Sequence, residues 1–176
     1  MIGAPKTTKL SSMDGPLSAQ ALGKRQIVES LDRAFARLHA SSCDIVRLIT
    51  SGQLYEPRGG ALSIGESILR SAAVVEQTFG GITANLWDDP FEWTLPEHLT
   101  TPAKVIEHLG EVEALRARAF ASFTDDSCLT KKVTTPAEQS EPLIDLLLET
   151  LRRAAAYQGH AGGKFVSRSD TGGFII

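Results

Sequence analysis

Apolar residues recur every three or four positions over four stretches of the chain, which is the period of an amphipathic α-helix. These stretches lie at about residues 20–49, 64–86, 102–123 and 141–159. No stretch of useful length alternates apolar and polar residues as a half-buried strand does. The pattern predicts an all-α protein, a four-helix bundle with long connections between its second and third helices and between its third and fourth.

Capping residues mark the start of the second and third predicted helices. Ser63 is followed three positions later by Glu66, the spacing of a capping box, in which each side chain bonds the backbone N–H of the other residue. Thr101 precedes Pro102, and proline is favoured at the first helical position because its missing N–H would have no partner there. We therefore expect the second helix to begin at residue 64 and the third at residue 102.

The fourth predicted helix has Ser140 and Pro142 as its start signal and reaches at least to Gly159, its natural stop. At about 100° per residue, Arg153 lies nearly opposite the clearest apolar face of this helix. Leu146 and Thr150 line the Arg153 side, so the helix could also be buried almost all round. The clearest apolar face comprises Ile144, Leu147, Leu148, Leu151 and Ala155.

The chain divides into an N-terminal arm, a bundle and a C-terminal tail. Residues 1–17 are rich in Ser, Thr, Gly and Pro, so we expect a flexible arm. Residues 18–166 carry the four helices as one domain with a single core, and residues 167–176 form a Gly-rich tail. Within the bundle, residues 87–100 hold both tryptophans and two prolines and predict a long connection whose aromatic side chains pack under the bundle.

Charge and cysteine content exclude several functional classes. The 18 Lys and Arg residues nearly balance the 21 Asp and Glu residues, and neither sign forms a run, so we expect no nucleic acid and no membrane as partners. Cys43 and Cys128 form no CxxC motif, which suits a packing role in a reducing compartment. No uncharged apolar run approaches the ~20 residues of a membrane span, and the N-terminus lacks the apolar core of a signal peptide. These features predict a cytoplasmic protein.

Three stretches of the chain resemble one protein family when they are taken together and in order. They are "LSIGESILRSAAVVE", "TTPAKVIEHLGEVEALRARAFASF" and "LLLETLRRAAAYQGHAGG". They resemble the DinB/YfiT-like superfamily of four-helix bundles, whose members are proposed metal-dependent hydrolases and thiol S-transferases. The resemblance implies a homodimer that forms through helix faces.

The resemblance also implies a metal site, which this chain lacks the residues to build. In the family, a histidine on the second helix and an H-x-x-x-H pair on the fourth hold a divalent metal such as Zn or Ni. The corresponding positions here are Ser71, Arg153 and Tyr157. A guanidinium has no lone pair to donate and repels a cation, and a serine and a phenol do not restore the site. We therefore expect no metal and no other cofactor.

The remaining histidines do not rebuild a metal site by their spacing. His39, His98 and His160 fall near a helix end, in a connection and beyond a helix stop, so they share no face. His108 and Glu111 form an H-x-x-E pair on the third helix, but both lie off its apolar centre line. A solvent-facing helix flank is the simpler interpretation of that pair.

Three interpretations of Arg153 stay open from the sequence. If the family register holds, Arg153 and Tyr157 point into the bundle near Ser71, where a buried guanidinium needs a carboxylate such as Glu149 or Glu76. In that case Arg153 and the carboxylate form a structural ion pair. Alternatively, Arg153 lies on a solvent-facing flank, or these side chains bind a carboxylate or phosphate of a small anionic ligand.

Two functional hypotheses follow from these residues. The first is a metal-free, non-catalytic DinB-like protein with a polar pocket at the former metal site, formed by Ser71, Arg153 and Tyr157 and binding a small anionic ligand. The second is an enzyme of the superfamily, a metal-dependent hydrolase with non-standard ligands or a thiol S-transferase. Metal content separates the first hypothesis from the metal-dependent branch of the second.

Overall fold

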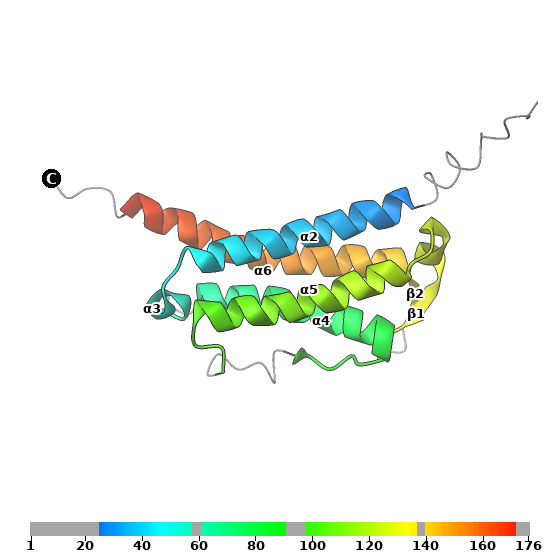
Figure 1. Cartoon of the computed structure of the whole chain (residues 1–176), viewed down its shortest axis with the longest axis horizontal. Helices are drawn as coiled ribbons and strands as arrows, with labels where there is room; N and C mark the ends of the chain where they lie inside the picture. The colour runs from blue at the N-terminus through cyan, green and yellow to red at the C-terminus, as the bar shows by residue number, and fades with distance from the viewer. Residues whose placement is uncertain (1–24, 58–60, 91–97, 137–139, 172–176) are drawn as a thin grey trace, which may run out of the picture.

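The four predicted long helices are all present in the computed structural model, which describes residues 25–57, 61–90, 98–136 and 140–171 (Figure 1). The arm expected at residues 1–17 and the last residues, 172–176, lie outside the described residues. The long helices are α2 (Gln26–Arg47), α4 (Ile64–Ala84), α5 (Pro102–Ser122) and α6 (Leu143–Thr171).

Short elements occupy the connections. The helix α3 (Ser51–Leu54) follows α2, and the 3-10 helix η2 (Asp126–Thr130) follows α5. Two three-residue strands, β1 (Lys132–Thr134) and β2 (Ser140–Pro142), pair antiparallel just before α6, with Val133 opposite Glu141. The chain is therefore helical apart from this one small hairpin within its described part.

The long helices pack in the cyclic order α2, α5, α4, α6, so that α2 and α4 lie diagonally across the bundle, as do α5 and α6. The first and second long helices, α2 and α4, are therefore not close neighbours. The same holds for the third and fourth, α5 and α6. The connection between diagonal helices must cross one end of the bundle, which agrees with the long segment between α5 and α6. The predicted all-α four-helix bundle with long connections is confirmed.

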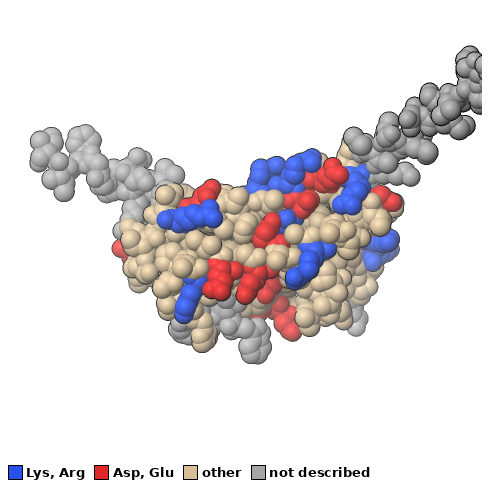
Figure 2. All heavy atoms as spheres, in the orientation of Figure 1, with Lys and Arg blue, Asp and Glu red and all other residues tan. Residues whose placement is uncertain are grey.

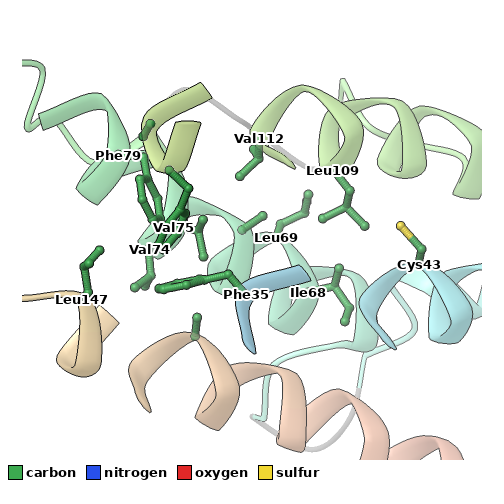
Figure 3. Packing of buried hydrophobic residues seen from close by; sticks show 14 of the residues in the cluster. Phe35, Cys43, Ile68, Leu69, Val74, Val75, Phe79, Leu109, Val112 and Leu147 are labelled. Carbon is green, nitrogen blue, oxygen red and sulfur yellow. The ribbon is translucent and has the colours of Figure 1, made fainter. Parts of the chain in front are cut away.

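Three phenylalanines join the diagonal helices at the centre of the core. The ring of Phe35 in α2 meets that of Phe79 in α4 edge to face, with centroids 5.3 Å apart, and Phe120 of α5 lies 5.8 Å and 5.5 Å from them. Figure 3 shows Phe35 and Phe79 pointing into the space between the helices, near Leu147 of α6. Each aromatic pair adds about 1 kcal/mol beyond the area that it buries.

The helix starts predicted from capping residues are confirmed for α4 and α5. The Ser63 hydroxyl accepts a hydrogen bond from the Glu66 amide at 3.1 Å, and the Glu66 carboxylate accepts from the Ser63 amide at 2.7 Å. At the start of α5, the Thr101 hydroxyl accepts from the Lys104 amide at 3.4 Å, and Pro102 is the first helical residue.

The predicted start of the fourth helix is wrong by two residues. Ser140 does not cap a helix but begins β2, and α6 starts at Leu143. Pro142 disfavours helical geometry at the preceding residue, so the segment stays extended and can pair with β1. The Leu143 amide then donates to the Lys131 carbonyl at 2.8 Å. Strands this short carry too few residues for an alternating pattern to be recognised.

Helix α6 passes through Gly159, the predicted stop, and continues to Thr171, so residues 167–171 of the predicted tail are helical. Glycine lowers helix propensity by about 1 kcal/mol relative to alanine, and packing outweighs that loss. Ala161 is fully buried, and the Gln158 side chain donates to the Leu38 carbonyl of α2 at 3.2 Å.

The buried face of α6 differs from the predicted one. Leu148 is 48% exposed and Ala155 is also exposed, whereas Thr150 is buried. Thr150 is accepted in the core because its hydroxyl bonds to that of Thr78 in α4 at 2.8 Å. The buried face comprises Leu143, Leu147, Thr150, Ala154 and Ala161.

The surface carries both signs of charge. Figure 2 shows acidic and basic side chains interspersed over the face that it presents. Among the described residues, no helix has a segment that is both long enough and apolar enough to cross a bilayer.

We expect Ser63→Ala to lower the free energy of unfolding by about 1 kcal/mol, because it removes the hydroxyl that accepts from the Glu66 amide in the buried capping box at the start of α4. Thr101→Ala is the matched control, since it removes a single longer bond at a more exposed helix start, and about half that loss is expected. Urea unfolding followed by circular dichroism measures both. An equal loss in the two variants would contradict this account of the α4 start.

Candidate functional site

Among the residues that the structure describes, the buried arginine is Arg116 in α5, not Arg153. Arg116 is 4% exposed, and two of its nitrogens donate to the Glu113 carboxylate at 2.8 Å and 2.7 Å. A third nitrogen pairs with the carboxylate of Asp32 in α2. The guanidinium carbon also lies 5.3 Å from the centre of the Phe120 ring. Arg116 therefore joins α2 to α5 beside the aromatic core.

The charge of Arg116 is stabilised where it lies. Burial alone would lower its pKa, but the hydrogen bonds from Glu113 and Asp32 outweigh burial and raise the pKa. The sequence did contain a signal for this residue, since position 116 falls between Val112 and Ala119 on the buried face of α5. A charged residue on an apolar face, with a carboxylate one turn earlier, indicates a buried ion pair.

Ser71 lies in the bundle interior. It is 2% exposed, and its hydroxyl donates to the Ala154 carbonyl of α6 at 2.8 Å. It also lines a cavity of about 30 Å³ between α2, α4 and α5, together with His39, Ser42 and Arg116. Such a volume is large enough for a water molecule and no more than a very small ligand.

Arg153 and Tyr157 line a different cavity, also about 30 Å³, between α4 and α6. From α4 this pocket takes Arg70, Ala73, Val74 and Gln77, and Asp89 follows the helix; Ser71 does not line it. We call these seven residues the Arg153 pocket. Ser71, which was predicted to lie with Arg153 and Tyr157, lines the other cavity instead, and Arg70 is the neighbouring residue of α4 that lines this one.

The geometry of α4 explains the difference between Ser71 and Arg70. Neighbouring residues of a helix point about 100° apart, so a shift of one position moves a side chain to another face. Positions 70, 73, 74 and 77 follow the spacing of a single helix face, and that face meets α6.

Arg153 is exposed, and its side chain forms no hydrogen bond or ion pair with the described residues. Its predicted partner Glu149 is bonded by Arg152 instead, at 2.8 Å and 2.6 Å. That hydrogen-bonded pair lowers the pKa of Glu149. The interpretation of Arg153 as a buried structural ion pair is therefore wrong, whereas its place in a pocket leaves a ligand-binding role open.

Glu76, the second predicted partner, lies on another face of α4. Its carboxylate is 3.8 Å from Nε2 of His108 in α5, and burial raises its pKa while His108 opposes that effect. Glu76 lines a pocket of about 390 Å³ with Leu86, Asp88 and Leu115, and this pocket does not include Arg153. The structure thus separates Glu76 from Arg153 and Tyr157.

His108 stands between two carboxylates, with Nδ1 at 3.9 Å from Glu111 and Nε2 facing Glu76. The two acids approach opposite sides of the ring, so they do not converge with one nitrogen on a common point. Among the described residues, no group of three His, Cys, Asp or Glu side chains is placed to hold a metal ion.

The two cysteines are free and buried, in agreement with the predicted packing role. Cys43 Sγ lies 3.6 Å from Nε2 of His39, and burial raises the pKa of the Cys43 thiol. Burial also raises the pKa of Cys128. Both side chains therefore stay protonated and unreactive as nucleophiles at neutral pH.

A larger cavity of about 400 Å³ adjoins the Arg153 pocket and shares Gln77 and Arg153 with it. We call it the Trp87 cavity. Arg153 stands where the two cavities meet, so a molecule in the larger one can reach the guanidinium. The residues that line it are Gln77, Thr78, Trp87, Thr135, Pro136, Glu141, Leu146, Glu149, Thr150 and Arg153.

Comparisons with known proteins identify the fold. No family model matches the chain, and no curated protein matches its sequence. Among solved structures, the fold is similar to a crystal structure from Exiguobacterium sibiricum 255-15, described as that of a proposed DinB family member. The two superimpose with a TM-score of 0.57 over 88% of this chain and 97% of the other, at 19% sequence identity. The chain therefore has a DinB-like fold, and at this identity the likeness says nothing of its chemistry.

We expect Arg116→Ala to lower the free energy of unfolding by about 3 kcal/mol, because two carboxylates lose a buried partner and the core loses its packed side chain. Arg153→Ala is the matched control, and a change within about 0.5 kcal/mol is expected because the side chain is exposed. Urea unfolding of both variants measures the difference. A loss in Arg153→Ala as large as that in Arg116→Ala would show that Arg153 has a structural role after all.

Proposed function

We propose that the protein is a metal-free, non-catalytic DinB-like protein that binds a small anionic ligand, a carboxylate or a phosphate, in the Arg153 pocket. The observation that supports this proposal is the presence of Arg70, Arg153 and Tyr157 around one cavity between α4 and α6. These side chains come from two helices that pack together over much of their length. The pocket is thus held by the bundle itself.

The lining of the pocket favours an anion over a metal ion. Arg70 and Arg153 bring two positive charges against the single carboxylate of Asp89, which leaves a net charge of about plus one. Guanidinium groups have no lone pairs for a metal, whereas their planar N–H groups match the oxygens of a carboxylate or phosphate. The hydroxyl of Tyr157 supplies a further hydrogen-bond donor.

Arg153 is suited to bind an external partner because it forms no hydrogen bond or ion pair with a carboxylate of its own helix. Glu149, the nearest carboxylate on α6, is occupied by Arg152. The Arg153 pocket itself is too small for a whole ligand, so we place one oxygen of the anion there and the body of the ligand in the adjoining cavity. An exposed arginine loses side-chain entropy on binding, so the affinity for a simple anion is modest.

The same lining supports a non-catalytic role. The residues around the Arg153 pocket include no histidine and no cysteine, and Asp89 is its one carboxylic acid. General acid–base or nucleophilic catalysis needs a positioned base or an activated nucleophile, usually with a partner that orients it. The alternative function, a metal-dependent hydrolase or thiol S-transferase with non-standard ligands, would require residues outside this pocket.

We further propose that the protein is a cytoplasmic homodimer. The homodimer rests on the family resemblance, and a cytoplasmic location agrees with two free, buried cysteines. Light scattering coupled to size-exclusion chromatography measures the oligomeric state.

We expect the purified protein to contain far less than one equivalent of zinc, nickel, iron or manganese per chain. The measurement is elemental analysis of untagged protein prepared without chelators. A stoichiometric metal would overturn the metal-free proposal and favour the enzymatic alternative.

Inorganic phosphate is expected to shift the NMR signals of the Nε–Hε groups of Arg70 and Arg153 in a saturable manner. Arg70→Gln and Arg153→Gln should each weaken phosphate binding about tenfold, which corresponds to about 1.4 kcal/mol. Arg118→Gln is the control, because this exposed arginine of α5 carries the same charge and lines none of the cavities described above. An equal effect of all three variants would reduce the binding to non-specific attraction and overturn the proposal.

A further inference from the structure

The end of α4 turns the chain back along its own helix. Asn85 adopts a left-handed conformation with φ of 55°, and its amide donates to the Gly81 carbonyl at 3.0 Å. The Leu86 amide donates to the Gly80 carbonyl at 3.2 Å. This pair of bonds ends the helix and directs the next residue, Trp87, onto the last turns of α4.

The indole ring of Trp87 is seated on the backbone of α4. A Cβ atom at Gly81 would lie only 2.4 Å from two carbon atoms of the ring, so any other residue at that position would displace the ring. The indole N–H donates to the Asn85 side chain at 3.1 Å, and the Trp87 carbonyl accepts from the Gln77 side chain at 2.7 Å. The orientation of the ring is therefore fixed before any ligand arrives.

Fixing the ring in this way reduces helix stability locally. Gly80 and Gly81 are unfavourable within a helix, yet both lie inside α4. Gly81 is required by the close approach of Trp87 rather than by an unusual backbone angle. A half-exposed tryptophan held this firmly presents a flat surface on the side that α4 does not cover.

Trp87 and Arg153 line the same cavity, which at about 400 Å³ is far larger than a phosphate or acetate ion and falls in the usual range for small-molecule sites. The hydroxyls of Thr78 and Thr150 bond to each other at 2.8 Å in its wall, and Leu146 adds an apolar contact. The cavity thus combines a cation at its junction with the Arg153 pocket and an aromatic surface in its body. Its wall also carries two carboxylates, Glu141 and Glu149, of which Glu149 is paired with Arg152.

We propose that the ligand of this site is an aromatic anion, a carboxylate or phosphate ester whose ring stacks on Trp87 while its charged group binds Arg153. This inference rests on the proposed function and adds the chemical class of the ligand. An aromatic ring suits the cavity because a flat, fixed indole gains most from a second flat ring in offset contact. Because the indole is already held rigidly, binding loses little side-chain entropy in ordering it.

The test compares phenyl phosphate with cyclohexyl phosphate and inorganic phosphate. The chain has two tryptophans, so Trp93→Phe leaves Trp87 as the only one and its fluorescence as the reporter. We expect phenyl phosphate to quench this fluorescence and to bind about tenfold more tightly than inorganic phosphate, with cyclohexyl phosphate between them. Equal affinities of the three phosphates would overturn the aromatic ligand.

Variants at Trp87 and Arg153, assayed by NMR titration, separate the two proposals. Trp87→Ala should remove the advantage of phenyl phosphate over inorganic phosphate, whereas Trp87→Phe should keep part of it. Arg153→Gln should weaken both ligands. If phosphate binding depends on Arg153 but the phenyl group adds nothing, the aromatic class fails and the anion site stands. If neither ligand binds, both proposals fail.

Gly81→Ala provides an independent check, because it displaces the ring while keeping it in the chain. The expected result is the loss of the phenyl advantage, as in Trp87→Ala. Gly110→Ala, at a helical glycine with open space around it, is the matched control and should leave both affinities unchanged. If the Gly81→Ala variant folds stably and phenyl phosphate still binds more tightly than inorganic phosphate by the same factor, the packing of Trp87 on Gly81 has no part in binding. That result would overturn the inference.

Discussion

The contact between the Arg116 guanidinium and the carboxylates of Asp32 and Glu113 sets how α2 meets α5. A buried guanidinium tolerates only arrangements in which its donors are satisfied, so it restricts the relative position of the two helices more sharply than apolar packing does. The guanidinium also packs on the ring of Phe120, which in turn contacts Phe35 in the aromatic core. The two helices are thereby held at a spacing that leaves α4 enclosed between α5 and α6.

Because α4 is enclosed between α5 and α6, each of its faces contacts different partners. These partners determine which bonds the side chains of each face can form. The face with Ser71 meets the interior and satisfies its hydroxyl on α6. The face with Glu76 meets His108 of α5, and the face with Arg70 meets Arg153 and Tyr157. A rotation of α4 by one residue would place a guanidinium in the core and a hydroxyl in the pocket. The position of the proposed anion site therefore depends on the packing that fixes this rotation.

The likeness to a proposed DinB family member shows that the same bundle fold forms from a sequence that is only 19% identical. The fold requires apolar faces, caps and satisfied buried polar groups, none of which involve a metal. Donor groups in a pocket between two helices can then change without loss of the core, because they lie at its rim and are solvated. Arg153 illustrates this freedom, since it is exposed and unpaired by its neighbours among the described residues. The proposed anion site lies at such a solvated position. Beside it, Trp87, which packs on Gly81, lines the larger cavity.

The sequence by itself determined what depends on neighbouring residues: four helical stripes, the caps at Ser63 and Thr101, and the proximity of Arg153 to Tyr157 on one helix face. These features arise from bonds and spacings within one or two turns. Only the tertiary structure decided that Arg116 is the buried arginine, that Arg70 and not Ser71 faces the pocket, and that α6 continues past Gly159. Those outcomes depend on the rotation of each helix against partners that are distant in the chain, and that rotation is fixed by packing and by pairing of buried charges rather than by local sequence.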